Sequence, residues 1–97
     1  MVIFGNLKLK TKQMKKFLYF SAMWCQPCRM LGPVMDEVAQ EGISVQKIDV
    51  DKSPEISQHY GVRNVPTVIL LNEMGEEQGR KVGANPKLAY LNMYNQN

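Results

Sequence analysis

The sequence predicts an α/β fold in which a central mixed β-sheet is flanked by helices. An apolar run, Phe17-Leu18-Tyr19-Phe20, has the length and aromatic content of a buried strand, and apolar residues then recur at helical spacing over residues 30–38. Residues 43–50 form a second predicted strand, and two strands joined by a helix make a right-handed βαβ unit with parallel strands. Two further strands separated by a short turn predict an antiparallel hairpin, which makes the sheet mixed.

The first helix is expected to run from about Pro27 to Gln40 and to end at Gly42. Pro27 suits the first turn, because its fixed φ is helical and its missing N–H would have no intrahelical partner there. Pro33 lies inside the helix and is expected to kink it.

Two more helices are expected later in the chain. The first is short, with Ser53 as its N-cap, Pro54 in its first turn and an end near Gly61. The second begins at Asn85-Pro86, and the side chains expected to face the sheet are Leu88, Leu91 and either Tyr90 or Tyr94.

The hairpin is predicted from strands at residues 65–71 and 77–82, with a turn within residues 72–75. The expected order of elements is therefore β-α-β-α-β-β-α. Residues 1–13 form either an N-terminal strand or an extension: Leu7-Lys8-Leu9-Lys10 alternates like an edge strand, and Gly5-Asn6 fits a turn.

Length and composition indicate one domain over residues 1–97. Hydrophobic residues make up 44% of the chain, and no linker, repeat or low-complexity tract divides it. The formal net charge of +3 comes from five lysines within residues 1–16, a segment that has no acidic residue. The rest of the chain is net acidic, and no aromatic residue alternates with those lysines from Lys8 onward, so we expect no nucleic-acid site.

Lys15 and Lys16 before the apolar run resemble the start of a signal peptide only superficially. The apolar stretch is shorter than a signal-peptide core and is interrupted by Ser21. No run approaches the roughly 20 apolar residues of a membrane span. We therefore expect a monomeric protein of the cytoplasm without membrane contact, in a reducing compartment where paired cysteines are catalytic rather than structural.

Cys25 and Cys28 are the only cysteines, and both fall at the junction of the first strand and the first helix. Cys25 then lies at the helix N-terminus, where free N–H groups and the positive end of the macrodipole favour a thiolate and lower the pKa of the thiol. Cys25 is therefore the expected attacking sulfur, and Cys28, one turn later, is the resolving thiol.

Other uses of the cysteine pair are less well supported. A zinc site needs about four ligands, and the chain adds only His59 and acidic residues without matching spacing. A structural disulfide across so short a loop removes little entropy from the unfolded chain. A CxxC pair beside a βαβ unit is instead the pattern of a redox centre.

Several motifs stand in a fixed order along the chain. They are Trp24-Cys25-Gln26-Pro27-Cys28, Pro33, Asp49-Val50-Asp51, Gly61-Val62-Arg63-Asn64-Val65-Pro66-Thr67 and Val82-Gly83-Ala84. On these motifs the chain resembles the thioredoxin family from about Phe17 to Tyr94. The resemblance implies a thioredoxin-like fold, a cis peptide bond between Val65 and Pro66 opposite the cysteines, and a flat apolar substrate surface formed by Trp24, Gln26, Pro27, Val50, Val65, Pro66, Val82, Gly83 and Ala84.

Two positions depart from the family pattern. Gln26 stands where thioredoxins commonly have a glycine, so the reduction potential of the pair is not transferable from the family. Tyr19 stands six residues before the first cysteine, where the family usually has a buried aspartate that relays protons for the resolving thiol. The lysine that accompanies this aspartate has a counterpart in Lys47. Deprotonation of Cys28 then depends on Tyr19, Lys47 or water.

The resemblance implies a compact variant, similar to small bacterial or phage thioredoxins, with a shortened N-terminal β-α region and a potential translation start at Met14. The expected function is that of a thiol–disulfide oxidoreductase that reduces protein disulfides through Cys25 and Cys28, with no bound cofactor and with electrons from a thioredoxin reductase. Two alternatives stay open: a glutaredoxin-like reductase that uses glutathione, and a non-enzymatic binding subunit with a thioredoxin fold.

Overall fold

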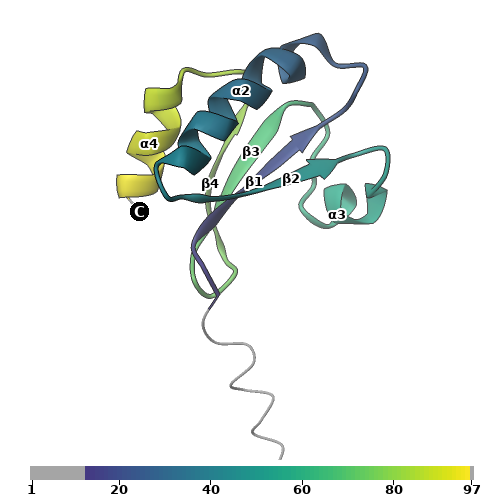
Figure 1. Cartoon of the computed structure of the whole chain (residues 1–97). Helices are drawn as coiled ribbons and strands as arrows, with labels where there is room; N and C mark the ends of the chain where they lie inside the picture. The colour runs from purple at the N-terminus through teal and green to yellow at the C-terminus, as the bar shows by residue number, and fades with distance from the viewer. Residues whose placement is uncertain (1–12, 97) are drawn as a thin grey trace, which may run out of the picture.

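Seven elements follow one another in the predicted order, β-α-β-α-β-β-α (Figure 1). The computed structural model describes residues 13–96, so the predicted turn at Gly5-Asn6 and the predicted strand at residues 7–10 lie outside it. The elements are β1 (Lys16–Ser21), α2 (Gln26–Gln40), β2 (Ser44–Asp49), α3 (Pro54–His59), β3 (Thr67–Leu71), β4 (Glu77–Val82) and α4 (Lys87–Gln96).

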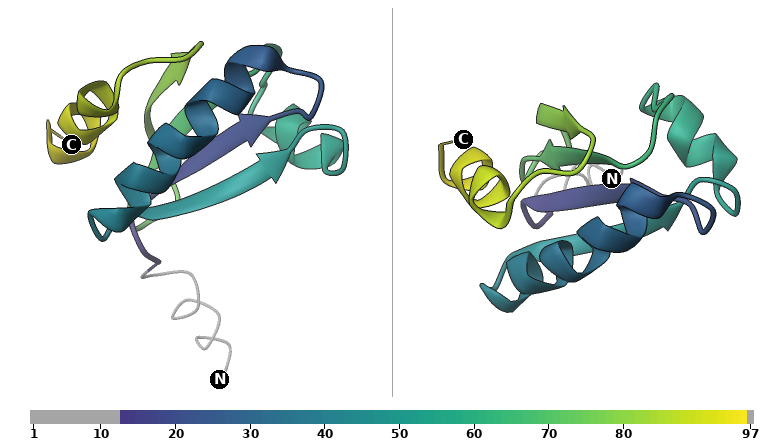
Figure 2. Two further views of the ribbon diagram at one scale, coloured as in Figure 1. Left: turned by 45° about the horizontal axis from the view of Figure 1, so that its top comes forward. Right: turned by 90° about the horizontal axis from the view of Figure 1, so that it is seen from above.

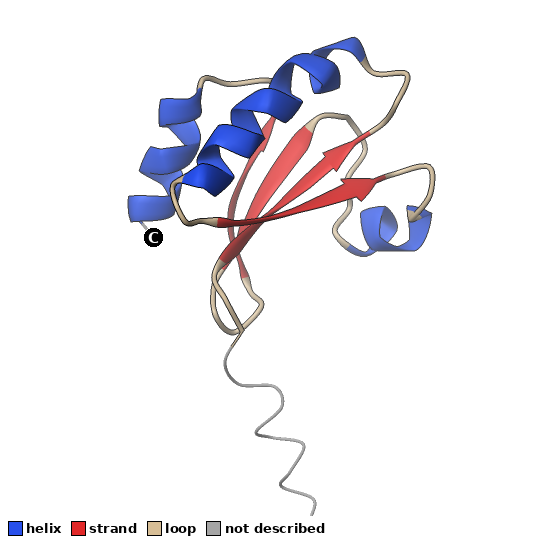
Figure 3. Cartoon of the chain, viewed as in Figure 1, coloured by secondary structure: helices blue, strands red, loops and turns tan. Residues whose placement is uncertain are grey.

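The four strands form one mixed sheet in the order β2-β1-β3-β4 (Figure 3). β1 pairs in parallel with β2 and antiparallel with β3, and β3 pairs antiparallel with β4. In the parallel pair, Tyr19 lies opposite Lys47 and Ser21 lies opposite Asp49. Alternate residues of a strand share one face of the sheet, so these four side chains belong to the same face.

Helices cover both faces of the sheet (Figure 2). α2 and α4 cover one face, over a core that includes Phe17, Tyr19, Leu31, Met35, Val38, Val68, Leu70, Tyr90 and Met93. α3 lies on the other face, where Ile56 and Tyr60 pack on Leu18, Phe20, Ile48, Ile69 and Leu71. Each fully buried Leu, Ile, Val or Phe side chain stabilises the fold by roughly 1.5–3 kcal/mol. β3 is buried along its whole length because both of its faces are covered.

Local chemistry sets both ends of α2. Cys25 is the N-cap, with φ −93° and ψ 111°, and Pro27 lies in the first turn as predicted. At the other end Glu41 is the C-cap, and Gly42 follows with a φ of +90°, in the left-handed region that favours glycine. The N-terminus of α2 therefore begins at the redox pair, and the helix then runs back along the sheet toward the start of β2.

The predicted inner face of α4 is wrong at one position. Leu88 is 64% exposed instead of facing the sheet, whereas Tyr90 is fully buried and Met93 is nearly so. Tyr90, Met93 and Tyr94 are spaced by three and four residues and so line one side of the helix, with Leu91 at its border. Leu88 precedes Tyr90 by two residues, a spacing that places it on the opposite side of the helix.

Candidate functional site

Cys25 and Cys28 lie at the junction between the end of β1 and the start of α2. Cys25 and Cys28 form a disulfide, and each cysteine is only 4% exposed. The Cys25 sulfur also accepts a hydrogen bond of 3.2 Å from the backbone N–H of Cys28, as an N-cap side chain does. The same N–H and the positive end of the helix dipole would stabilise negative charge on this sulfur after reduction.

Trp24 stands beside the pair and projects into solvent. Its side chain is 68% exposed, and its indole N–H donates a 2.9 Å hydrogen bond to the carboxylate of Asp51. Met23, the preceding residue, is 72% exposed, and Met30 in α2 is 69% exposed. Exposed large apolar side chains that gather around a reactive group are typical of a protein-binding surface.

The loop before β3 forms the opposite wall of the site. The peptide bond between Val65 and Pro66 is cis, and Val65 packs with Ala22 and the two cysteines. A pocket of about 260 Å³ lies between this loop and Trp24, lined by Trp24, Val50, Val62, Arg63, Asn64 and Val65.

Gly83 closes the site on the side of β4. Its N–H donates a 2.8 Å hydrogen bond to the carbonyl of Pro66, which ties the end of β4 to the cis-proline loop. Its φ of +89° is in the left-handed region, which a residue with a side chain adopts only with strain. Its neighbours Val82 and Ala84 are exposed.

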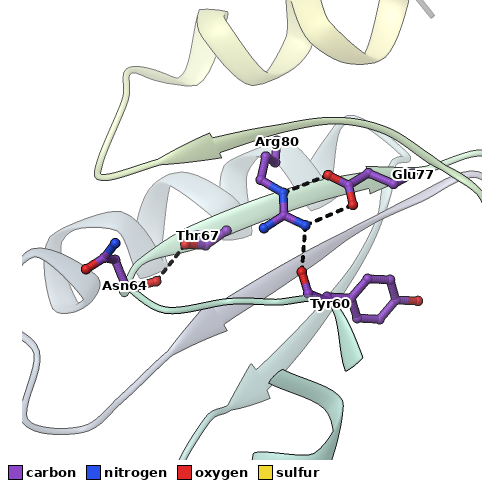
Figure 4. A network of polar contacts seen from close by, with 5 residues as sticks. All are labelled: Tyr60, Asn64, Thr67, Glu77 and Arg80. Carbon is purple, nitrogen blue, oxygen red and sulfur yellow. Dashed lines mark hydrogen bonds and ion pairs between the residues drawn. The ribbon is translucent and has the colours of Figure 1, made fainter. Parts of the chain in front are cut away.

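A polar network holds the cis-proline loop to the sheet (Figure 4). Arg80 on β4 donates to the carbonyl of Tyr60 at 2.7 Å and forms a bidentate pair with Glu77 at 2.7 and 2.9 Å. Nearer the proline, the Thr67 hydroxyl donates a 2.6 Å hydrogen bond to the carbonyl of Asn64. The hydrogen bond from Arg80 is also the main reason why the pKa of Glu77 lies below its usual range.

Tyr19 on β1 reaches across to Cys28 in the first turn of α2. Its hydroxyl donates a 2.6 Å hydrogen bond to the carbonyl of Cys28. Burial raises the pKa of Tyr19, although a hydrogen bond with Ser21 opposes this shift. The tyrosine therefore keeps its proton near neutral pH.

An open cavity of about 220 Å³ adjoins the same side of the pair. It is lined by Tyr19, Ser21, Ala22, Met23, Cys28, Arg29, Gly32, Lys47 and Asp49. The ammonium of Lys47 is 2.7 Å from the carboxylate of Asp36, and both side chains are more than half exposed. Lys47 therefore lies at the rim of this cavity, opposite Tyr19 in the sheet. Its ammonium is exposed and is paired with Asp36.

The structure divides the predicted site residues into two groups. Val50 and Val65 pack against the pair, and Trp24 precedes Cys25 in the chain. Gln26, Pro27, Val82 and Ala84 are exposed and Gly83 is half-buried, whereas Pro66 is fully buried. Tyr19 and Lys47 lie on the inner side, toward the sheet.

Sequence reasoning missed the roles of Asp51 and Arg80. Asp51 follows β2, whose end lies at the same sheet edge as the end of β1, and this shared edge was a usable signal. Arg80 had no such signal, because its partner Tyr60 is 20 residues away in the chain and the two meet only through the sheet pairing.

Comparisons with known proteins agree with this geometry. The family model for thioredoxin matches residues 6–95. The thioredoxin of Rickettsia bellii is 40% identical over 81 residues, which cover 80% of this chain and 76% of that protein. Thioredoxin 1 of Synechococcus elongatus is 40% identical over 76 residues, which cover 75% of this chain and 70% of that protein.

Solved structures give the same result. The reduced thioredoxin pre-protein of Schistosoma mansoni superimposes with a TM-score of 0.81 at 29% identity, over 96% of this chain and 88% of that one. A mutant thioredoxin of Halobacterium salinarum gives a TM-score of 0.80 at 31% identity, over 99% of this chain and 83% of that one. The chain belongs to the thioredoxin family and is a thiol–disulfide oxidoreductase built around a redox-active CxxC pair, Cys25 and Cys28.

Proposed function

We propose that this oxidoreductase reduces disulfide bonds in other proteins. The observation that carries the proposal is the setting of Cys25, whose sulfur caps α2 next to the exposed Trp24 and packs against Val65 of the cis-proline loop. A small disulfide needs no exposed apolar side chain there, whereas a protein substrate gains contact area from it. Trp24 and Val82, which are 68% and 58% exposed, would lie under the bound segment.

The reaction proceeds by two exchanges at sulfur. The Cys25 thiolate attacks one sulfur of the substrate disulfide, and the other substrate sulfur leaves as a thiolate. The thiolate of Cys28 then attacks Cys25 in this mixed disulfide, so that the Cys25–Cys28 bond forms and the second substrate sulfur leaves. Two electrons pass from the cysteine pair to the substrate, and the protein returns to the disulfide form.

The substrate segment would lie between Trp24 and the cis-proline loop. The backbone N–H and carbonyl of Val65 would bind the segment, with the buried Pro66 beneath it and Gly83 and Ala84 at the far edge. Gln26 and Pro27 lie between the two cysteines and modulate the potential of the pair. Cys28 acts from behind, as the resolving thiol.

Partners and compartment follow from the same chemistry. The electron donor would be a thioredoxin reductase, and the cycle needs no prosthetic group, because the cysteine pair itself carries the two electrons. We place the protein in the cytoplasm as a monomer, where a reductase could keep the cysteine pair reduced. Within residues 13–96, no helix is long and apolar enough to cross a membrane.

Reduction of insulin by dithiothreitol tests the proposal. We expect the wild-type chain to accelerate precipitation of the reduced insulin chains and the Cys25→Ser variant to lose this activity. Equal activity of the two proteins, or no activity in either, would instead support a non-enzymatic binding role. A dependence on glutathione and glutathione reductase, in place of thioredoxin reductase, would indicate a glutaredoxin-like cycle.

A further inference from the structure

The resolving step requires a base, because Cys28 attacks only after its thiol has lost a proton. Cys28 is 4% exposed in the disulfide form, and the carbonyl of the same residue is held by Tyr19. The open cavity of about 220 Å³ that Cys28 lines offers the space through which its proton could leave. This inference rests on the proposed function, in which Cys28 is the resolving thiol.

Six of the residues that line this cavity carry a polar or ionisable side chain, namely Tyr19, Ser21, Cys28, Arg29, Lys47 and Asp49. The two cations are not proton acceptors, since a guanidinium and an ammonium have no free lone pair. Arg29 donates to the carbonyl of Met23 at 3.0 Å, and Lys47 pairs with Asp36 at 2.7 Å. Both cations favour the thiolate of Cys28 once it has formed.

The hydroxyl groups are also excluded as bases. Tyr19 donates its only hydroxyl hydrogen to the Cys28 carbonyl and is buried, so it remains a neutral donor. The Ser21 hydroxyl can pass a proton on but is too weak a base to keep it. Among the residues described around this cavity, the carboxylate of Asp49 is the one proton acceptor.

Asp49 is held in place for this role. It ends β2 opposite Ser21, on the face of the sheet that carries Tyr19. Its Oδ1 atom accepts hydrogen bonds from the N–H groups of Asp51 at 2.8 Å and Lys52 at 3.3 Å. Both of these bonds fall on Oδ1, so the lone pairs of Oδ2 remain for a proton.

The cavity is large enough for water to connect the two groups. A water molecule occupies about 30 Å³ in the liquid, so a cavity of about 220 Å³ admits several. Gly32 contributes to this space, because a Cβ atom added there would meet nothing within 4 Å.

We infer that the Asp49 carboxylate accepts the proton of Cys28, through water in this cavity, during the resolving step. The S–H bond of Cys28 breaks and its proton passes to Asp49. The thiolate of Cys28 then attacks Cys25, the Cys25–Cys28 bond forms, and the bond from Cys25 to the substrate breaks. The substrate sulfur leaves with the electron pair, and Asp49 returns its proton to that sulfur or to solvent.

Reaction of the reduced protein with dithiobis(nitrobenzoate) separates the two exchanges. Attack by Cys25 releases one thionitrobenzoate at a rate that depends on reagent concentration, and attack by Cys28 releases the second in a first-order step. For Asp49→Asn we expect an unchanged first release and a second release slowed by roughly 10- to 100-fold near pH 6. Above the free thiol pKa of about 8.5, hydroxide deprotonates Cys28 and the two proteins should converge.

Asp36→Asn is the matched control, because it removes the same charge from the partner of Lys47 without touching the cavity lining. It should leave the second release near the wild-type rate at every pH. Equal slowing in both variants would mean that net charge, and not proton transfer, governs the step, and an unchanged pH profile in Asp49→Asn would overturn the inference.

A second variant tests the water route with Asp49 intact. Gly32→Leu should fill the cavity and slow the second release near pH 6, whereas Gly32→Ala should change it little. Wild-type rates in Gly32→Leu would contradict the route. If the wild-type protein itself gave only one release, Cys28 would not be the resolving thiol and the proposed function would fail, whatever the variants do.

Discussion

The hydroxyl of Tyr19 donates a 2.6 Å hydrogen bond to the backbone carbonyl of Cys28. A core tyrosine of β1 thus holds the first turn of α2, which carries both redox cysteines, against the sheet. Because burial raises its pKa and its hydrogen is donated to a carbonyl, we expect Tyr19 to position Cys28 and not to deprotonate it.

The variant Tyr19→Phe separates these roles. It removes the hydroxyl that donates to the buried Cys28 carbonyl. We therefore expect the free energy of unfolding to fall by about 1–3 kcal/mol. The second thionitrobenzoate release should stay within about threefold of wild type with an unshifted pH profile, since no base is lost. Urea unfolding of the oxidised proteins and the two-step release assay measure the two effects, and a displaced pH profile would give Tyr19 a part in proton transfer.

The same residue predicts a change in stability at alkaline pH. The folded-state pKa of Tyr19 lies above the unfolded value of about 10, so the unfolded chain loses this proton first. The stabilisation by Tyr19 is therefore complete below about pH 10 and is lost as the pH rises through the folded-state pKa. The difference in unfolding free energy between wild type and Tyr19→Phe should shrink from pH 8 to about pH 11. The pKa of Tyr90 is also raised by burial. Because Tyr90 is present in both proteins, its own titration contributes to both unfolding free energies and drops out of their difference.

Much of this fold could be predicted because its central strands are continuous apolar runs. β1 and β3 are buried on both faces, so the residues that fill them are apolar at nearly every position. The redox pair could also be predicted from the sequence, because the spacing of the two cysteines and their position before a helix are local features. The error at Leu88 has a different cause: the sequence of α4 has no distinct apolar side, so its inner face depends on how the helix packs on the sheet.

The remainder of the site depends on residues that are distant in the sequence. Asp51 is 27 residues from Trp24, and Arg80 is 20 residues from Tyr60. The place of Asp49 at the cavity follows only from the register that sets it opposite Ser21. Periodicity predicts which face of a strand is buried but not which residue of the neighbouring strand lies opposite. The shared sheet edge could have suggested that Asp51 lies near the site, but the individual pairs needed the structure.

The two cysteines should differ in reactivity although their exposure is the same. Each is 4% exposed in the disulfide form, so access alone predicts equal alkylation after reduction. The Cys25 sulfur, however, caps α2 and accepts the Cys28 N–H, which should place the pKa of its thiol below the free value of about 8.5. Brief treatment of the reduced protein with iodoacetamide at neutral pH, followed by peptide mapping, should label Cys25 first. Preferential labelling of Cys28 would exchange the assigned roles.

The pair formed by Arg80 and Glu77 should make a small, pH-dependent contribution to stability. The hydrogen bond from Arg80 lowers the folded-state pKa of Glu77 below its usual value of about 4.3. The stabilisation is therefore present above that value and is lost as the pH falls through the folded-state pKa. Because the pair lies near the surface, the effect should be at most about 1 kcal/mol.

Urea unfolding of wild type and Glu77→Gln at pH 7 and at about pH 3 measures this contribution, since the two proteins should differ only at the higher pH. Glu73→Gln is a suitable control, because Glu73 is an exposed acidic residue outside the network. A difference that persists in acid would show that Glu77 acts through packing instead of charge.

The hydrogen bond between Trp24 and Asp51 should affect substrate binding more than stability. Both side chains are exposed, so the loss of this bond in Asp51→Ala should change the free energy of unfolding by no more than about 0.5 kcal/mol. The freed indole would lose its fixed orientation over the groove, and we expect the KM for a protein disulfide to rise several-fold with little change in kcat.

Trp24 is the only tryptophan in the chain, so its fluorescence anisotropy decay should gain a fast component in Asp51→Ala. Asp51→Asn, which keeps an acceptor oxygen for the indole N–H, should behave like wild type in both measurements. If Asp51→Ala leaves the anisotropy decay unchanged, contacts other than this hydrogen bond hold the indole in place.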